Sequence, residues 1–305
     1  MKHPMGLASF EGLIARASMG TRRRVAVAGA QDPHALEAVL HAAGQGLLDY
    51  QLVGDRARIC AAATALGIPI DAEQIVGADT DGQAAFEAVR LVREGACNLL
   101  MKGGMPTATL LSEVVNRETG IRSGGLLSHV ALLELPGYPK LLALTDGGMV
   151  VTPDLGQKRM ILENAVALLH RLGIERPKVA LLAAVETVNP KMSATVDAAA
   201  LKALAKAGEL PGCLVDGPLS FDLMFSPESA AIKGFCSPVT GDADLLLVPD
   251  MTAGNLLCKA MIYTAHAQMA GVIVGALAPI VLVSRGATAE EKYFSLALAA
   301  AGAAV

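Results

Sequence analysis

Residues 24–33 read RVAVAGAQDP, and this stretch indicates the fold class. An apolar run ends at Gly29, and Pro33 follows at a position that the first turn of a helix tolerates. The same order of apolar run, glycine and helical pattern recurs at 50–66 and at 98–117. A series of strand, glycine-containing loop and helix predicts parallel α/β winding.

The middle of the chain has a different pattern. Two strand-like runs, 128–135 and 140–145, are separated only by the turn residues PGYP at 136–139, which predicts an antiparallel hairpin. A long amphipathic helix is expected from Asp154 to about Leu172, and α/β alternation then resumes. The later strands are expected at 179–183, 213–216, 245–248 and 280–283.

The composition favours a protein with a large aliphatic core. Apolar residues make up 53% of the 305 residues, charged residues 18% and aromatic residues only 3%, which suits helices packed on a buried parallel sheet. A net charge of −4 argues against nucleic acid as a partner, because the chain has no basic surplus to neutralise phosphates.

The cysteines and the apolar runs bear on the location of the protein. Five cysteines without a CxxC spacing fit a reducing compartment, so we expect a cytoplasmic protein. The longest apolar stretch, 271–283, contains Pro279 and falls short of the roughly 18 residues that a membrane helix needs. We therefore expect no membrane partner.

Glycines and charged residues follow the predicted strands. In open parallel sheets, ligands bind beyond the carboxyl ends of the strands. Glycines let backbone N–H groups approach an anion, and an arginine offers two parallel donors to a phosphate. This set of residues favours a phosphate-bearing small molecule. The segments are Gly54-Asp55, Lys102–Gly104, Asp146–Gly148, Asp216–Pro218, Pro249-Asp250 and Ser284–Gly286.

Several common sites have no support in the sequence. There is no GxxxxGK[ST] motif, and the loop after the first strand reads GAQDP rather than GxGxxG, so ATP and a standard Rossmann dinucleotide are disfavoured. The six histidines are scattered, so no metal site is predicted. Ser128 and His129 are neighbours on one strand and should face opposite ways, which argues against a Ser/His pair.

Most of the strand-end residues also have a simpler structural explanation. Asp250 can cap a helix that begins near Gly254, and the side chain of Lys102 can extend to solvent. Glu290 and Glu291 lie in the first turn of the last helix, where acids favour the helix dipole. Ser284-Arg285 is the most informative pair, because an arginine at the end of a buried strand needs an anion.

A family resemblance rests on six longer stretches. Together they resemble the phosphate acetyl/butyryltransferase family, and the butyryl branch is closer than the acetyl branch. The likeness runs from about residue 24 to the carboxyl terminus. The stretches are LLMKGGMPT (99–107), residues 121–155, residues 178–201, GCLVDGPLSFD (212–222), residues 237–263 and GVIVGALAPIVLVSRG (271–286).

The resemblance implies a fold and a reaction. The fold is two α/β domains with a cleft between them, similar to isocitrate and isopropylmalate dehydrogenases; we expect residues 1–128 plus 272–305 in one domain and 129–271 in the other. The reaction is acyl-CoA + phosphate ⇌ acyl phosphate + CoA. Acyl-CoA and inorganic phosphate are then the partners, coenzyme A is a substrate, and no cofactor or metal is consumed. Members of the family are commonly homodimers or higher homo-oligomers.

The resemblance also implies site residues. Ser284, Arg285 and Gly286 match the family's Ser-Arg-Gly, and a carboxylate after them is the expected base. The acetyl branch has aspartate where this chain has Glu291, whereas Glu290 matches the butyryl branch equally well, so both glutamates stay candidates. The implied substrate-binding residues outside this motif are Lys102, Arg122, Ser123, Asp216, Asp250, Gly254 and Asn255.

One residue departs from the family pattern. Members of both branches place an arginine, expected to bind the phosphates of coenzyme A, where this chain has Leu111. Either coenzyme A binding through that route is weaker in this chain, or the function passes to Arg117, Lys102 or Arg122.

The residue types suit direct attack of the CoA thiolate on the acyl phosphate. A thiol with a pKa near about 8.5 is mostly protonated at neutral pH, so a carboxylate that takes its proton accelerates the attack. Ser284 and nearby N–H groups would stabilise the oxyanion, and Arg285 would hold the phosphoryl oxygens.

Two other functions remain open at this stage. A decarboxylating dehydrogenase of the related fold would need a nicotinamide site and an aspartate cluster for a metal. A non-catalytic sensor of acyl-CoA or acyl phosphate is compatible with Leu111. The aspartates considered for the first alternative are Asp216, Asp242, Asp244 and Asp250.

Overall fold

The computed structural model describes residues 7–210, 212–284 and 286–303. The chain forms two compact units. The first unit comprises Phe10–Gly125 and Ala270–Val305, and the second comprises Met1–Ser9 and Leu126–Met269. Among the described residues, no helix is long and apolar enough to cross a membrane.

The first unit contains a mostly parallel sheet in the order β3-β2-β1-β4-β11-β10. Among the described pairs of this unit, β10 and β11 are antiparallel, and β1–β2, β1–β4, β4–β11 and β2–β3 are parallel. The strands are apolar because helices cover both faces of the sheet. Their bounds are β1 (Arg23–Ala28), β2 (Leu48–Gly54), β3 (Ile75–Gly77), β4 (Leu99–Lys102), β10 (Gln268–Val274) and β11 (Ile280–Val281).

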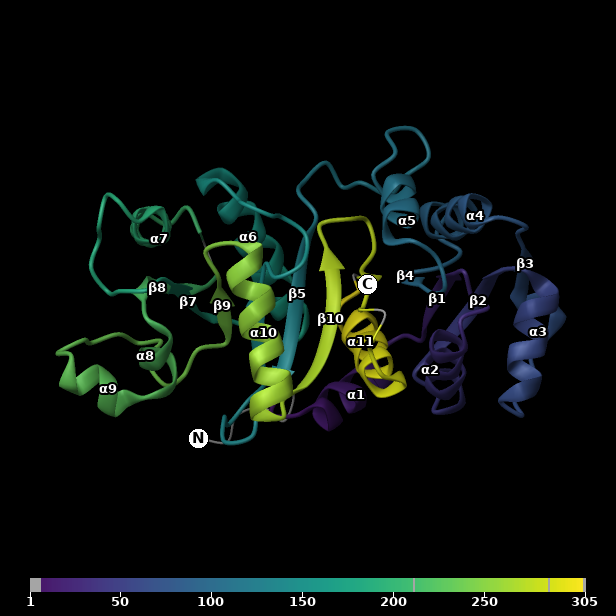
Figure 1. The fold of residues 1–305 in the computed structure, drawn as a ribbon, viewed down its shortest axis with the longest axis horizontal. Coiled ribbons are helices and arrows are strands. Elements are labelled where there is room, and N and C mark those ends of the chain that lie inside the picture. Colours follow the sequence, from purple (N-terminus) through teal and green to yellow (C-terminus); the bar gives the residue numbers. More distant parts are fainter. Residues whose placement is uncertain (1–6, 211, 285, 304–305) are drawn as a thin grey trace. The chain divides into compact units, whose positions relative to one another are not determined.

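The helices of the first unit lie on the two faces of this sheet (Figure 1). On one face are α4 (Asp81–Arg93) and α5 (Thr107–Val114); the other face carries α2 (Pro33–Gly44) and α11 (Ala289–Gly302). Helix α1 (Phe10–Met19) packs on α11 through Phe10 and Phe294, whose rings stack with centroids 4.5 Å apart. Helix α3 (Arg56–Ala65) and the short 3₁₀ helix η1 (Ala72–Gln74) complete the unit.

The helix starts follow from the chemistry of the loops. Asp32 accepts a hydrogen bond from the N–H of Ala35 at 2.7 Å, and Pro33 then opens α2. Asp55 caps α3 in the same way, through the N–H of Arg58 at 3.0 Å. These side chains satisfy backbone donors that the first turn of a helix leaves without partners.

The second unit contains the strands in the order β5-β6-β9-β7-β8. The pair β5–β6 is the antiparallel hairpin predicted from the sequence, and the other neighbours are parallel. The strands are β5 (Ser128–Glu134), β6 (Leu142–Thr145), β7 (Lys178–Leu182), β8 (Leu214–Leu219) and β9 (Leu245–Leu247).

Five helices complete the described part of the second unit. The long helix expected after Asp154 is α6 (Leu155–Arg171), and it packs beside α7 (Ser193–Lys206). Residues of the other three helices pack on the strands in one buried cluster that includes Leu223, Met224, Ala230, Cys258 and Met261. Those helices are α8 (Phe221–Phe225), α9 (Pro227–Ile232) and α10 (Met251–Ala265).

The elements that were not predicted from the sequence include α1, η1, β3 and β10. The expected strand at 280–283 is also shorter, since β11 ends at Val281. The apolar stretch 271–283 is two antiparallel strands joined by a turn that begins at Gly275, whose φ is +89°.

Candidate functional site

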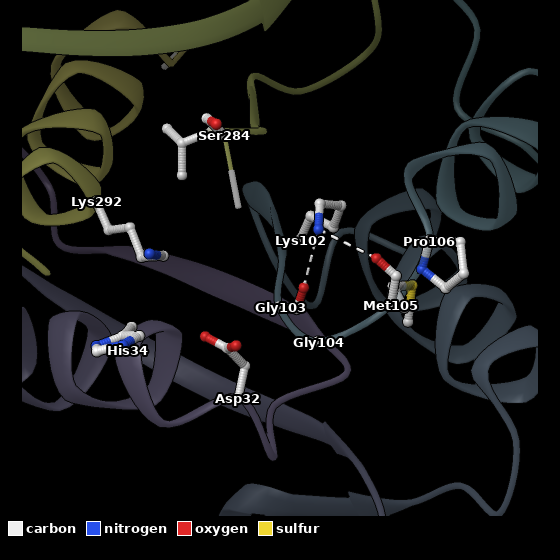
Figure 2. Close-up of a pocket in the computed structure, with 10 residues that line it drawn as sticks. Asp32, His34, Lys102, Gly103, Gly104, Met105, Pro106, Ser284 and Lys292 are labelled. Atoms are coloured by element: carbon white, nitrogen blue, oxygen red, sulfur yellow. Dashed lines mark hydrogen bonds between the residues drawn. The ribbon is translucent and has the colours of Figure 1, made fainter. Parts of the chain in front are cut away.

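A pocket of about 400 Å³ lies in the first unit, at the carboxyl ends of β1, β4 and β11 (Figure 2). Its wall combines two lysines, a carboxylate, a histidine and a serine. This is the edge of a parallel sheet where ligands usually bind. The lining residues are Asp32, His34, Lys102, Gly103, Gly104, Met105, Pro106, Val283, Ser284 and Lys292.

The glycines after β4 pack the loop against the loop after β1. The N–H groups of Gly103 and Gly104 donate to the carbonyls of Ala28 and Gly29, both at 2.8 Å. A Cβ atom on Gly103 would lie 2.3 Å from the Gly29 oxygen. The expectation that these glycines offer N–H groups to an anion is therefore wrong, because backbone carbonyls already accept from them.

Lys102 lines the pocket, as its predicted place at the end of a strand suggested. Its ammonium donates to the carbonyls of Gly103 and Met105, each at 3.1 Å (Figure 2). The side chain is half-buried and folds back over its own loop rather than extending into solvent. Its charge is therefore held at the pocket wall.

Ser284 also lines the pocket, and it begins a turn. The Ser284 hydroxyl accepts a hydrogen bond from the N–H of Gly286 at 3.4 Å, and its carbonyl accepts from Ala287 at 3.0 Å. Gly286 is exposed. Arg285, the predicted phosphate anchor, lies outside the described residues, so its assignment remains a prediction.

The two candidate bases differ in their surroundings. Glu290 is exposed. Glu291 is half-buried and forms a capping box with Thr288, in which its carboxylate accepts from the Thr288 N–H at 2.8 Å and Thr288 accepts from the Glu291 N–H at 3.1 Å. Neither glutamate is among the pocket-lining residues described above. The geometry leaves both candidates open.

Asp32, His34 and Lys292 line the pocket, and sequence reasoning missed all three as site residues. The signal for Lys292 lay in the helical period. Lys292 shares a spacing of three to four residues with Ser295, Leu296 and Ala299, so it falls on the buried face of α11. A charged side chain on the buried face of a helix is costly, so a lysine there suggests a function, whereas a lysine that faces solvent does not.

Arg122 and Ser123 lie elsewhere in the first unit and are exposed. Arg122 pairs with Ala276 in an isolated β-bridge, and the Ser123 hydroxyl donates to the carbonyl of Gly275 at 2.6 Å. Leu111 is half-buried on α5. The pocket lining includes none of these three residues.

Three predicted residues of the second unit hold the start of α10 against the end of β6. Asp250 caps α10 by accepting from the N–H of Ala253 at 2.9 Å. Asn255 donates to the carbonyl of Gly147 at 3.3 Å. A Cβ atom on Gly254 would lie 2.9 Å from the Gly147 Cα, so only glycine fits there. The structural explanation given above for Asp250 is confirmed, and α10 begins at Met251 rather than near Gly254.

Asp146 orders the loop that receives α10. This buried carboxylate accepts from the N–H groups of Gly148 and Met149 at 2.8 Å and of Val150 at 3.2 Å. Because three backbone N–H groups donate to this carboxylate, the Asp146–Gly148 segment forms a turn that ends β6.

Ser128 and His129 make separate contacts, as strand alternation predicted. The buried Ser128 hydroxyl accepts from the Asn164 amide at 3.0 Å. A Cβ atom on Gly148 would lie 3.2 Å from the His129 ring, so the ring packs on that glycine. Burial lowers the pKa of His129, although the nearby Asp146 carboxylate opposes that shift.

Asp216 is buried and forms an ion pair with Lys202. Burial alone would raise the pKa of this carboxyl group, but hydrogen bonds from Lys202, Ser237 and the N–H of Gly217 together lower it below its usual range. The N–H of Gly217 lies 2.8 Å from the carboxylate. These contacts give Asp216 a stabilising role within the second unit.

Two further aspartates considered for a metal are also paired. Asp242 and Asp244 both contact Lys140, at 2.6 Å and 2.7 Å, and Asp242 also pairs with Lys178. Within residues 7–210, 212–284 and 286–303, no three His, Cys, Asp or Glu side chains come together in a way that could hold a metal ion. The four aspartates therefore do not converge into the cluster that the dehydrogenase alternative requires.

Comparison with known proteins shows the family of the chain. Residues 80–300 match the family model described as "Phosphate acetyl/butaryl transferase". The chain belongs to this family. It is 45% identical over 291 residues to the "Probable phosphate butyryltransferase" of Bacillus subtilis, covering 95% of this chain and 96% of that protein. It is 39% identical over 301 residues to a "Phosphate acetyltransferase" of Rhizobium meliloti, covering 99% and 95%.

Solved structures agree with the family assignment. A branched-chain phosphotransacylase from Enterococcus faecalis superposes with a TM-score of 0.80 at 36% identity, covering 92% of this chain and 98% of that one. A 4-hydroxythreonine-4-phosphate dehydrogenase from Burkholderia phymatum gives a TM-score of 0.55 at 16% identity over 92% and 99%, a likeness of fold alone. The predicted fold class, two α/β domains related to dehydrogenases, is thereby confirmed.

The contacts of Asp216 predict a pH-dependent contribution to stability. Its lowered pKa means that the stabilisation is present above the ordinary aspartate pKa of about 3.9 and is lost as the pH falls through the folded-state value. We expect Asp216→Asn to lower the free energy of unfolding by about 1–3 kcal/mol at pH 7 and by much less near pH 3. Urea unfolding across this pH range measures the difference.

The control for this experiment is Asp79→Asn. Asp79 is exposed and forms no ion pair with a described residue. Asp79→Asn should leave the free energy of unfolding unchanged at every pH. A loss of stability in Asp216→Asn that stayed constant from pH 7 to pH 3 would contradict the role of the carboxylate charge.

Proposed function

We propose that the protein transfers a short-chain acyl group, butyryl or acetyl, between coenzyme A and inorganic phosphate. The observation that carries the proposal is the similarity over almost the whole chain to proteins named phosphate butyryltransferase and phosphate acetyltransferase. The pocket supports it independently, since Lys102, Lys292 and Ser284 bring two cations and a hydroxyl to one strand-end edge.

The proposed chemistry breaks one bond and forms one bond. In the direction of acyl-CoA synthesis, the CoA thiolate attacks the carbonyl carbon of the acyl phosphate, a C–S bond forms, and the C–O bond to phosphate breaks. The thiol proton passes to a carboxylate, for which Glu290 and Glu291 are the candidates. The phosphate leaves as the anion, and in the reverse direction it is the nucleophile.

The charge that develops in this reaction indicates how the site residues would act. The tetrahedral intermediate carries an oxyanion, which the Ser284 hydroxyl would stabilise by donating a hydrogen bond. Arg285 would hold the phosphoryl oxygens with its two parallel donors, and Gly286 would let the turn form beside them. Lys102 would add a fixed positive charge at the pocket wall.

The remaining predicted residues divide into two groups. Arg122 and Ser123 are exposed and suit contact with the extended coenzyme A molecule, which replaces the route lost at Leu111. Asp216, Asp250, Gly254 and Asn255 make contacts within the second unit, so we propose that they act by holding loops in place.

The proposal includes a cellular location and an assembly. Five cysteines without disulfides fit a cytoplasmic protein. A homodimer or higher homo-oligomer is compatible with Leu256 and Tyr263, which are 64% and 77% exposed on α10. Sedimentation velocity checks the assembly, and a monomer at micromolar concentration would contradict it.

The central test is a thiol-release assay with a panel of acyl-CoAs and phosphate. We expect phosphate-dependent release of CoA with one or more short-chain substrates, and a loss of roughly 10²-fold or more in Arg285→Ala, the scale for removal of one transition-state donor. Arg171→Ala, an exposed arginine on α6, is the control and should keep the wild-type rate. Reduction of NAD with a hydroxy acid, without thiol release, would support the dehydrogenase alternative instead. Tight CoA binding without turnover would support the sensor.

The two glutamates can be separated by replacing each with glutamine. Glu291→Gln keeps a residue that can complete the capping box with Thr288, so its effect reports on the carboxylate rather than on the helix start. We expect one of Glu290→Gln and Glu291→Gln to lose about 10²–10⁴-fold in rate while its affinity for CoA is retained. Steady-state rates and calorimetric CoA titration measure the two properties. Full rates in both variants would place the base elsewhere.

A further inference from the structure

Two lysines are buried in the described parts of the chain, and they differ in their partners. Lys158 is 5% exposed, and its ammonium contacts the Asp197 carboxylate at 2.7 Å. Lys292 is 6% exposed, and its ammonium donates to the carbonyl of Ala287 at 2.6 Å. Among the described residues, no carboxylate lies within ion-pair distance of Lys292.

A buried ammonium without a counter-charge is costly. Burial removes water from the charge, and one carbonyl satisfies only one of its three donors. Lys158 shows how this protein meets the same cost elsewhere, with a carboxylate. The environment of Lys292 is therefore incomplete without an anion.

The missing anion has a place to bind. Lys292 lines the pocket of about 400 Å³, and its side chain points toward the middle of that pocket from α11 (Figure 2). Lys102 lines the same pocket from the end of β4. The described lining carries one acid, Asp32, whose carboxylate caps α2.

The place of Lys292 in the chain indicates which part of the substrate it meets. The carbonyl that it binds belongs to Ala287, three residues after Ser284, so the ammonium is tied to the turn that carries the predicted catalytic serine. The pocket has a volume near the lower end of small-molecule sites, which suits a small anion more than the whole of coenzyme A.

We infer that Lys292 binds the phosphoryl oxygens of inorganic phosphate and of the acyl phosphate, with Lys102 as the second cation of the same subsite. This inference rests on the proposed function for the identity of the anion. A lysine ammonium is a compact charge with rotatable donors, which suits an oxygen-rich anion. Lys292 is a binding residue for the transferred phosphate, separate from the attack itself.

The decisive variant is Lys292→Met, which keeps the approximate length of the side chain and removes its charge. In wild-type protein, phosphate at matched ionic strength should raise the melting temperature, because a ligand that binds the folded state stabilises it. Lys292→Met should lose most of this rise and should melt no lower than wild type without phosphate. Its KM for phosphate should increase at least about tenfold, and its KM for acyl-CoA by less than about twofold.

Lys158→Met is the matched control, because it removes a lysine that is equally buried. It leaves Asp197 without its ion-pair partner, so it should melt lower than wild type without phosphate. The rise in melting temperature with phosphate should be intact. The two variants thus have opposite signatures, and a structural role for Lys292 would give it the signature of Lys158.

A second variant tests the subsite from the opposite direction. Asp32→Asn keeps a residue that caps helices well and removes the negative charge from the pocket wall. Phosphate should then bind roughly threefold or more tightly, because repulsion between like charges is gone. Lys292→Arg keeps the cation and should retain most of the phosphate-dependent rise.

The outcomes separate this inference from the proposed function. Thermal shift by phosphate does not require turnover, so a shift that depends on Lys292 in a protein without thiol release would support the subsite and overturn the transferase. Thiol release with an unchanged phosphate response in Lys292→Met would overturn the subsite alone. If Lys292→Met does not fold, an unchanged phosphate affinity in Asp32→Asn overturns it.

Discussion

The close approach of two backbone loops in the first unit positions the candidate site. The loop after β4 donates two N–H groups to the loop after β1, and Gly103 allows a contact that any Cβ atom would block. This contact brings the end of β4, with Lys102, next to the start of α2, with Asp32. The shape of the pocket therefore depends on hydrogen bonds between two backbone segments. Because these N–H groups already donate to carbonyls, side chains have to supply the positive charge that attracts an anion.

The distribution of paired charges explains why the small anion is assigned to the first unit. In the second unit, Lys140 and Lys178 neutralise Asp242 and Asp244, and Lys202 neutralises Asp216. Lys233 likewise bridges Glu186 and Asp222. Because carboxylates balance the positive charge of these lysines, the lysines stabilise their own unit and attract a ligand only weakly. Lys292 is buried to a similar degree as Lys158, which pairs with Asp197, but the partner of Lys292 among the described residues is a carbonyl.

Sequence patterns predicted most strands, the hairpin and the long helix because those elements carry local signals: apolar runs, turn residues and capping acids. They did not separate β10 from β11, because 271–283 is apolar on both sides of its turn and a buried antiparallel pair has no polar face to mark the boundary. The helix α1 was missed because its contact with α11, the stacking of Phe10 on Phe294, lies almost the whole chain away in sequence.

The site itself was predictable only where chemistry and strand ends coincide. Lys102 and Ser284 follow strands, and strand order alone places them at one edge of a sheet. Lys292 does not follow a strand. Its role depends on two structural facts: the last helix buries this face, and no carboxylate of the described residues pairs with the lysine there. Arg285, which follows a predicted strand, and Lys292, on the last helix, have the same physical requirement: each positive charge needs a negative charge to balance it. In the described part of the first unit, the protein supplies no such charge to Lys292, so the answer has to come from a ligand.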